Sequence, residues 1–221
     1  MNFFGHAVIA QRYETARGQV RPEFVLGAML PDFASMLRVR PPEVTEPVLA
    51  SGARFHHATD DAFHGAESFL EFSRAASSYL SERGLSRGSA RAVAHVGVEL
   101  LLDGAFASKN AANEAYLSAL DAALTISISS HINWGDSVYA ARFQQLCHNL
   151  RQRGGSRADA PAELVAERLR NILADRPRLA MDEAGESVVR DWVVSARPRI
   201  VASADLVLSE VERRLVFEHY S

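Results

Sequence analysis

The chain has 221 residues, of which 48% are hydrophobic and 23% are charged, and these values exclude a disordered or fibrous protein. Its formal net charge of -3 at pH 7 excludes a protein that coats nucleic acid, because such proteins are strongly basic. No apolar run is long enough to cross a bilayer, no export signal is evident, and the single Cys147 suits a reducing compartment, so we expect a cytoplasmic protein.

Apolar residues recur at helical spacing along most of the chain, and Gly, Pro, Ser and Asn residues separate the segments. The sequence therefore predicts an all-α protein. Pro22 favours the start of one helix, and Ser86 precedes another. The predicted helices span residues 3–17, 23–37, 45–62, 65–82, 87–107, 111–126, 136–152, 160–174, 184–195 and 200–218.

Residues 124–129 alternate between polar and apolar like a strand, but no second such run could pair with them. We therefore predict a loop or a helix end there. We expect a single domain over residues 1–221, because no linker is long enough to require two. The glycine-containing segment 153–157 could separate residues 157–221 as a helical cap.

Residues 90–103 form an almost wholly apolar segment with polar residues four positions apart. His95, Glu99 and Asp103 therefore lie along one face of the predicted helix. Burying carboxylates without partners costs several kcal/mol, and a bound cation would remove that cost. The alternative is a solvated stripe in which His95 is a surface neighbour of the two carboxylates.

A second segment, residues 55–64, repeats this spacing with His56, Asp60 and His64. Imidazole and carboxylate groups one helical turn apart can bind the same ion, as they do in helical zinc motifs. The second stripe therefore favours the metal-binding interpretation of the first. His57 and Asp61 form an adjacent pair that could bind the ion or orient its ligands.

Two further polar residues stand in apolar surroundings, His6 within residues 3–10 and Asp32 within residues 26–33. Each alone also fits a structural role, as a satisfied core histidine or a turn aspartate. Together with the two stripes they favour a site of nitrogen and oxygen ligands, which suits Mn²⁺, Zn²⁺ or Fe²⁺. The number of carboxylates suggests two ions, which can activate water and hold both oxygens in a displacement at phosphorus. We therefore expect a metal-dependent phosphodiesterase.

At these residues the sequence resembles the bacterial acyl carrier protein phosphodiesterases, a helical family grouped with the HD-type metal phosphohydrolases. The opening MNFFGH is similar to that family's MNFLAH start, and LGAMLPDF at 26–33 resembles its G-N-x-x-x-D-F segment. GARFH at 52–56 with Asp60 resembles G-I-x-x-H-x-x-x-D. The helix from His95 to Asp103 is similar to H-x-x-x-D-x-x-x-D-H-F, with Glu99 in place of the first aspartate and Gly104 in place of the second histidine.

The resemblance implies an HD-domain-like helical bundle that hydrolyses the phosphodiester between 4′-phosphopantetheine and a serine of acyl carrier protein. His64 would be a further metal ligand or a general acid, and Arg54 or Arg91 would clamp the phosphate. Asp60 counts among the catalytic residues too, because its loss is expected to abolish hydrolysis. The implied metal ligands are His6, Asp32, His56, Asp60, His95, Glu99 and Asp103.

An acidic carrier protein would dock on an arginine patch. The sequence offers two candidates for this patch. They are Arg12, Arg17 and Arg21, or Arg168, Arg170, Arg176 and Arg178.

The same residues are also similar to the zinc-dependent phospholipase C group, which is helical and uses an H-x-x-x-D element, a following histidine and an H-x-x-x-E element. This rival implies a phospholipase-C-like bundle and a phospholipid substrate. A third interpretation is a helical binding protein that keeps the ligands but has lost turnover, which the glycine at Gly104 permits. The residues matching the phospholipase elements are His56, Asp60, His64, His95 and Glu99, with His6 and Asp32 completing the set.

Overall fold

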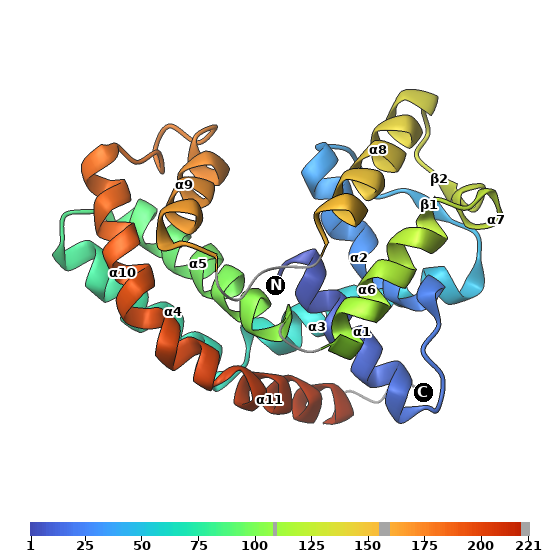
Figure 1. Cartoon of the computed structure of the whole chain (residues 1–221), viewed down its shortest axis with the longest axis horizontal. Coiled ribbons are helices and arrows are strands. Elements are labelled where there is room, and N and C mark those ends of the chain that lie inside the picture. Colours follow the sequence, from blue (N-terminus) through green and yellow to red (C-terminus); the bar gives the residue numbers. More distant parts are fainter. Residues whose placement is uncertain (108–109, 155–159, 218–221) are drawn as a thin grey trace. The chain divides into compact units, whose positions relative to one another are not determined.

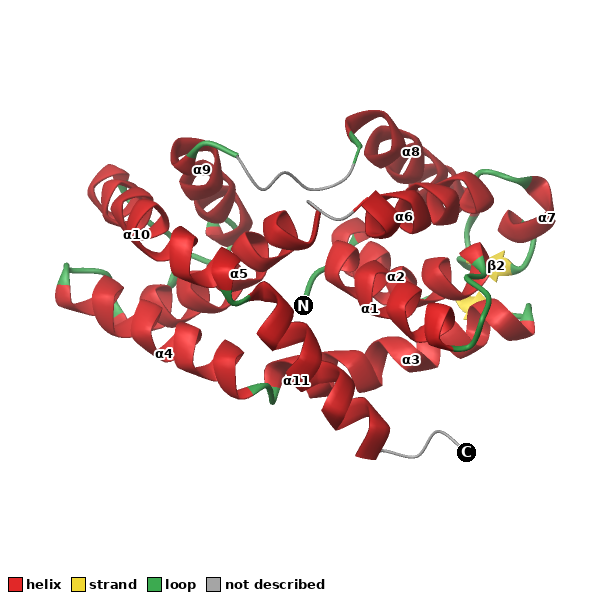
Figure 2. Cartoon of the chain, turned by 60° about the horizontal axis from the view of Figure 1, so that its bottom comes forward, coloured by secondary structure: helices red, strands yellow, loops and turns green. Residues whose placement is uncertain are grey.

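The computed structural model describes residues 1–107, 110–154 and 160–217, and helices make up nearly all of its regular structure (Figures 1 and 2). The prediction of an all-α protein is confirmed. Within the described ranges, no helix combines the length and the apolar character that a membrane span requires. The helices are α1 (Phe3–Ala16), α2 (Pro22–Leu37), α3 (Pro47–His64), α4 (Glu67–Glu82), α5 (Arg87–Ala107), α6 (Asn110–Ala123), α7 (Ile126–Ser129), α8 (Ser137–Arg153), α9 (Ala162–Leu173), α10 (Glu183–Ala202) and α11 (Ala204–Phe217).

The predicted helices up to residue 174 agree with the observed ones to within one turn at each end, and helices begin at Pro22 and directly after Ser86 as expected. The largest difference lies in α10, which continues past the predicted end at residue 195 and through Pro198. Proline removes the hydrogen bond to the carbonyl four residues earlier, and its ring crowds that carbonyl. That carbonyl belongs to Val194, whose side chain is 63% exposed, so water can reach this face of the helix.

Two short features differ from the prediction. Residues 126–129, predicted as a loop or a helix end, form the separate single turn α7. The antiparallel pair of strands β1 (Glu43–Val44) and β2 (Ile132–Asn133) was not predicted (Figure 2). Two residues are too few to produce a recognisable alternation in the sequence.

The chain divides into two compact units. The first unit comprises residues 1–61 and 106–156, and the second comprises residues 62–105 and 157–221. Helices α3 and α5 contribute residues to both. Our expectation of a single domain stays a prediction. Of the predicted cap, α10 and α11 lie against α4 within the second unit.

In the first unit, α1, α2 and α6 lie side by side, and α8 lies against α2 and α6 (Figure 1). The side chain of Asn2 caps α1 by accepting a hydrogen bond from the Phe4 amide at 3.0 Å. Phe4 meets the ring of Tyr116 on α6 edge-on, with ring centroids 5.2 Å apart. The cap and this aromatic contact hold His6 on the buried face of α1.

Two glycines allow α2 and α3 to cross backbone to backbone in the first unit. A Cβ atom on Gly27 would overlap the carbonyl oxygen of Leu49, and one on Gly52 would overlap that of Phe24. Only residues without a side chain fit this crossing. The close approach brings the carbonyl of Ala28 within reach of the side chains of α3.

In the second unit, α10 packs against α9 and α4, and α11 packs against α4. Gly97 on α5 makes room for Trp192 of α10, because a Cβ atom there would lie 2.6 Å from the indole ring. The start of α4 is capped from α11 by Glu210, which accepts hydrogen bonds from the amide and the hydroxyl of Ser68, both at 2.9 Å. These contacts hold α4 and α5 in place within the second unit.

Candidate metal centres

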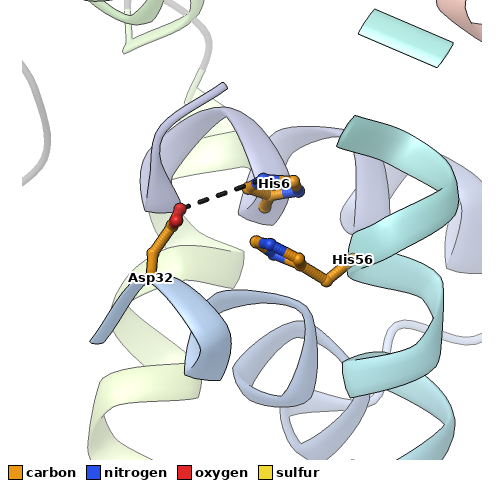
Figure 3. A group of neighbouring side chains, drawn as sticks. All are labelled: His6, Asp32 and His56. Carbon is orange, nitrogen blue, oxygen red and sulfur yellow. Dashed lines mark ion pairs between the residues drawn. The ribbon is translucent and has the colours of Figure 1, made fainter. Parts of the chain in front are cut away.

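Three potential ligands from three helices come together in the first unit. His6 of α1, Asp32 of α2 and His56 of α3 each offer one nitrogen or oxygen atom, and these atoms lie within 4.8 Å of one another. In Figure 3 the Asp32 carboxylate points toward the His6 ring, which is stacked on the His56 ring with centroids 3.8 Å apart. Both histidines are buried, whereas Asp32 is partly exposed. We call these three residues the first group.

Hydrogen bonds on the far side of each ring determine which nitrogen of each histidine is available. The Thr59 hydroxyl donates to the His56 carbonyl at 2.8 Å, so it accepts from Nδ1 of His6, also at 2.8 Å. The carbonyl of Ala28 can only accept, so His56 donates to it through Nδ1 at 2.9 Å. Both rings therefore carry a proton on Nδ1, and Nε2 is the nitrogen left for a cation, as in metal-bound histidines.

Negative charge surrounds the available nitrogen of His6. Its Nε2 lies 3.9 Å from Oδ2 of Asp32 and 3.7 Å from Oδ1 of Asp60. The same Asp60 oxygen accepts a hydrogen bond from the amino group of Met1 at 3.0 Å. Burial lowers the pKa of the His56 ring, against the opposing effects of its backbone hydrogen bond and of the Asp60 charge, and so favours the neutral form that binds cations.

A second group of ligands lies within the second unit and consists of His64 at the end of α3 with His95 and Glu99 of α5. Nε2 of His64 lies 3.1 Å from Oε1 of Glu99, and Nε2 of His95 lies 3.0 Å from the same oxygen. The two rings are stacked, with centroids 4.7 Å apart, and Phe69 packs edge-on against both. The side chain of His95 is 47% exposed and that of Glu99 is 10% exposed, so the group opens to solvent on the histidine side.

The charge of Glu99 is set by two opposing effects. Burial alone would raise the pKa of its carboxyl, but the hydrogen bonds from His64 and His95 outweigh burial and hold the pKa far below its usual range. Glu99 is therefore ionised at neutral pH. Asp103, one turn further along α5, is also buried but belongs to neither group. Both carboxylates are buried, so the alternative interpretation of a solvated stripe is wrong for Glu99 and Asp103.

The stripe on α3 is divided between the two groups. His56 belongs to the first group, with Asp60 beside it, and His64 belongs to the second. The described residues do not bring His56, Asp60 and His64 to one ion, because residues eight apart are separated by about 12 Å along a helix. His57 and Asp61 are exposed and belong to neither group.

The two arginines predicted to clamp a phosphate lie in different units. Arg91 is on α5 one turn before His95, and both residues line one groove of the second unit. Arg54 is exposed on α3 in the first unit and does not line that groove. The structure therefore brings Arg91, but not Arg54, to a surface shared with the second group.

At least two arginines of the predicted docking patches already form ion pairs within the chain, Arg21 with Glu14 and Arg170 with Glu186, whose Oε2 lies 3.0 Å from Nε of Arg170. Arg21 forms a two-pronged ion pair with Glu14, in which Nε donates to Oε2 and a terminal nitrogen donates to Oε1, both at 2.7 Å. Glu14 is fully buried. The charge of Arg21 is therefore needed inside the first unit and is poorly placed to attract an acidic partner.

The donor atoms of both groups fit the expected metals. Each group offers imidazole nitrogens and one carboxylate, a combination that suits Mn²⁺, Zn²⁺ or Fe²⁺ and leaves coordination positions for water or substrate. The thiol of Cys147 does not compete, because burial raises its pKa to about 12.

Sequence reasoning missed the role of Thr59, which fixes the tautomer of His6. The sequence does place Thr59 near the metal-binding face, because it lies three residues after His56 and one before Asp60 on the same helix. The partner on α1, however, cannot be read from spacing within α3.

Comparison of the chain with protein-family models, with curated proteins and with solved structures finds no match.

Proposed function

We propose that the chain is a metal-dependent phosphodiesterase that acts at the second group, His64, His95 and Glu99. The observation that carries this proposal is the convergence of two Nε2 atoms, at 3.1 and 3.0 Å, on one oxygen of an ionised carboxylate. A cation held by these three side chains would supply positive charge to a phosphate oxygen and lower the pKa of a bound water.

The residues around this group have separate tasks in the proposal. Glu99 balances the charge of the cation, and Phe69 packs edge-on against both imidazole rings and restricts their rotation. Arg91, one turn before His95, binds oxygens of the phosphate. The exposed edge of His95 leaves the substrate a way in. The first group holds a second cation with His6, Asp32 and His56, and Asp60 lies beside it.

Within this class we propose holo acyl carrier protein as the substrate, on the strength of the motif resemblance. Water would then add to phosphorus and release 4′-phosphopantetheine from the carrier serine. A phospholipid, which the resemblance to zinc-dependent phospholipase C suggests, and metal binding without turnover are the alternatives that experiments distinguish.

Hydrolysis of bis-p-nitrophenyl phosphate tests the reaction class. After treatment with a chelator, we expect no turnover until Mn²⁺, Zn²⁺ or Fe²⁺ is restored. His95→Ala and Asp60→Ala are each expected to remove turnover while circular dichroism shows unchanged helical content. If none of the three ions supports hydrolysis but the protein binds them, the chain is a metal-binding protein without this activity.

Incubation with holo acyl carrier protein, beside phosphatidylcholine vesicles, tests the substrate. Mass spectrometry is expected to show the carrier protein losing its phosphopantetheine arm while the lipid stays intact. Release of a phosphorylated headgroup with no change in the carrier protein would instead assign the phospholipase-like reaction.

Replacing Thr59 by valine tests the first group. Valine keeps the shape but cannot accept the hydrogen bond from Nδ1 of His6, so we expect cation affinity at the first group to fall about 10- to 100-fold. Calorimetric titration with Zn²⁺ measures this change, with Thr59→Ser as the control that keeps the hydroxyl. Equal affinities in the valine variant and the unchanged protein would contradict the assigned role of Thr59.

A further inference from the structure

A long groove runs between α4 and α5, entirely within the second unit. Its volume is about 1150 Å³, which exceeds the roughly 300–1,000 Å³ of most small-molecule pockets. One end of the groove reaches His95 of the second group. The lining residues outside the serines and arginines include Leu70, Glu82, Gly88 and Ala92.

Seven of the twelve described residues that line the groove carry a guanidinium or a hydroxyl group. Arg74, Arg87 and Arg91 line it and are all exposed. Within the described ranges, none of these three guanidinium groups has a side-chain hydrogen bond or an ion pair. The one carboxylate in the described lining, Glu82, instead lies near Arg83, with Oε2 of Glu82 3.9 Å from Nη1 of Arg83. The hydroxyls belong to four serines of α4: Ser73, Ser77, Ser78 and Ser81.

The spacing on α5 gives the groove a direction. Arg87, Arg91 and His95 are four residues apart, so they follow one face of the helix toward the second group. A guanidinium binds the oxygens of a phosphate group through paired hydrogen bonds, and a serine hydroxyl can donate or accept one. The groove therefore presents anion-binding groups on α5 and neutral polar groups on α4. One of its ends adjoins a candidate cation site.

We propose that this groove binds an organic phosphate, with a phosphate group held by Arg87 and Arg91 and the polar body of the molecule lying along the serines of α4. The inference rests on the proposed function, because the phosphate that Arg91 holds one turn from His95 is the group that reacts. Arg87, one turn further from the second group, adds a second guanidinium to the same anion.

The lining residues also disfavour other ligands. Apart from His95, no aromatic side chain lines the groove among the described residues, so it lacks the stacking surfaces that single-stranded nucleic acids use.

Phosphorus NMR titration of the chelator-treated protein with glucose 6-phosphate tests the proposal without any metal or turnover. We expect the phosphate signal to broaden and shift on addition of protein. Arg87→Gln and Arg91→Gln are each expected to weaken binding roughly 1.5- to fivefold, the range for solvent-exposed charge pairs. Arg213→Gln, an exposed arginine on α11 outside the groove, is the matched control and is expected to leave affinity unchanged.

Two further ligands identify what the groove recognises. Glucose, followed by proton NMR, is expected not to bind, because it lacks the anion. Poly-glutamate is expected to compete weakly. Equal affinities for glucose 6-phosphate in all three variants, or tighter arginine-dependent binding of poly-glutamate than of glucose 6-phosphate, would overturn the proposal.

This experiment separates the inference from the proposed function. Arginine-dependent binding of glucose 6-phosphate in a protein that hydrolyses no phosphodiester would support the groove and contradict the enzyme. Metal-dependent hydrolysis with no such binding would support the enzyme and contradict the groove.

Discussion

Replacing Glu99 by glutamine is expected to reduce metal-dependent phosphodiester hydrolysis by about 10³-fold or more. Glutamine keeps the size of the side chain and one carbonyl oxygen but removes the negative charge that His64 and His95 face at 3.1 and 3.0 Å. A cation contributes several kcal/mol of charge stabilisation to displacement at phosphorus, and each 1.4 kcal/mol corresponds to about tenfold in rate. Loss of the cation therefore removes most of the catalysis.

Two measurements on this variant distinguish its possible causes. Metal analysis of the purified Glu99→Gln protein is expected to show loss of one bound ion per chain, while circular dichroism shows helices retained. Glu167→Gln, an exposed carboxylate on α9 in the same unit, is the control and should keep both activity and metal. Full activity with the usual metal content in Glu99→Gln would remove the second group from the reaction.

Most of the fold could be predicted because the helices are amphipathic and clearly punctuated. The helix around Glu99 was predicted with its observed bounds, residues 87–107. The failure at Pro198 has a different cause, since proline normally ends a helix but α10 continues through it to Ala202. Whether a helix continues through a proline depends on tertiary packing, which local sequence does not encode.

The candidate site could be predicted in its residues but not in their grouping. Spacing of four placed His95 and Glu99 on one face, and the structure brings them together at 3.0 Å. The same rule extended to His56 and His64 divides across two groups, because residues eight apart are separated by about 12 Å along the helix axis. Contacts between helices, such as the one from Thr59 to His6, have no signature within either helix.

The groove between α4 and α5 was not predicted at all. In the sequence, its arginines and serines resemble the polar faces of two amphipathic helices, and such faces usually point to solvent. Arg91 was singled out only as a possible phosphate clamp. What distinguishes these residues is that the faces of two helices border the same groove, and that is a property of the packing.

Replacing Gly52 by alanine is expected to destabilise the protein by at least about 3 kcal/mol, the upper part of the range for overpacked interiors. The added Cβ atom would overlap the carbonyl oxygen of Phe24 and lie 3.0 Å from the Cα atom of Gly27. Both neighbours are backbone atoms, so no side chain can move aside. The helices α2 and α3 must separate, and urea denaturation followed by circular dichroism measures the cost.

The same separation should reach the first group, because Nδ1 of His56 donates to the carbonyl of Ala28, next to the crossing. Under conditions where Gly52→Ala remains folded, we expect weaker Zn²⁺ binding at the first group. Gly185→Ala on α10 is the control, since its Cβ would meet only side-chain atoms, at 3.3 Å and beyond. Alanine favours a helix over glycine and only the side chain of Asp182 must shift slightly, so this variant should change stability far less than Gly52→Ala. Equal stability of Gly52→Ala and Gly185→Ala would mean that α2 and α3 do not cross backbone to backbone. The position assigned to His56 in the first group would then be wrong as well.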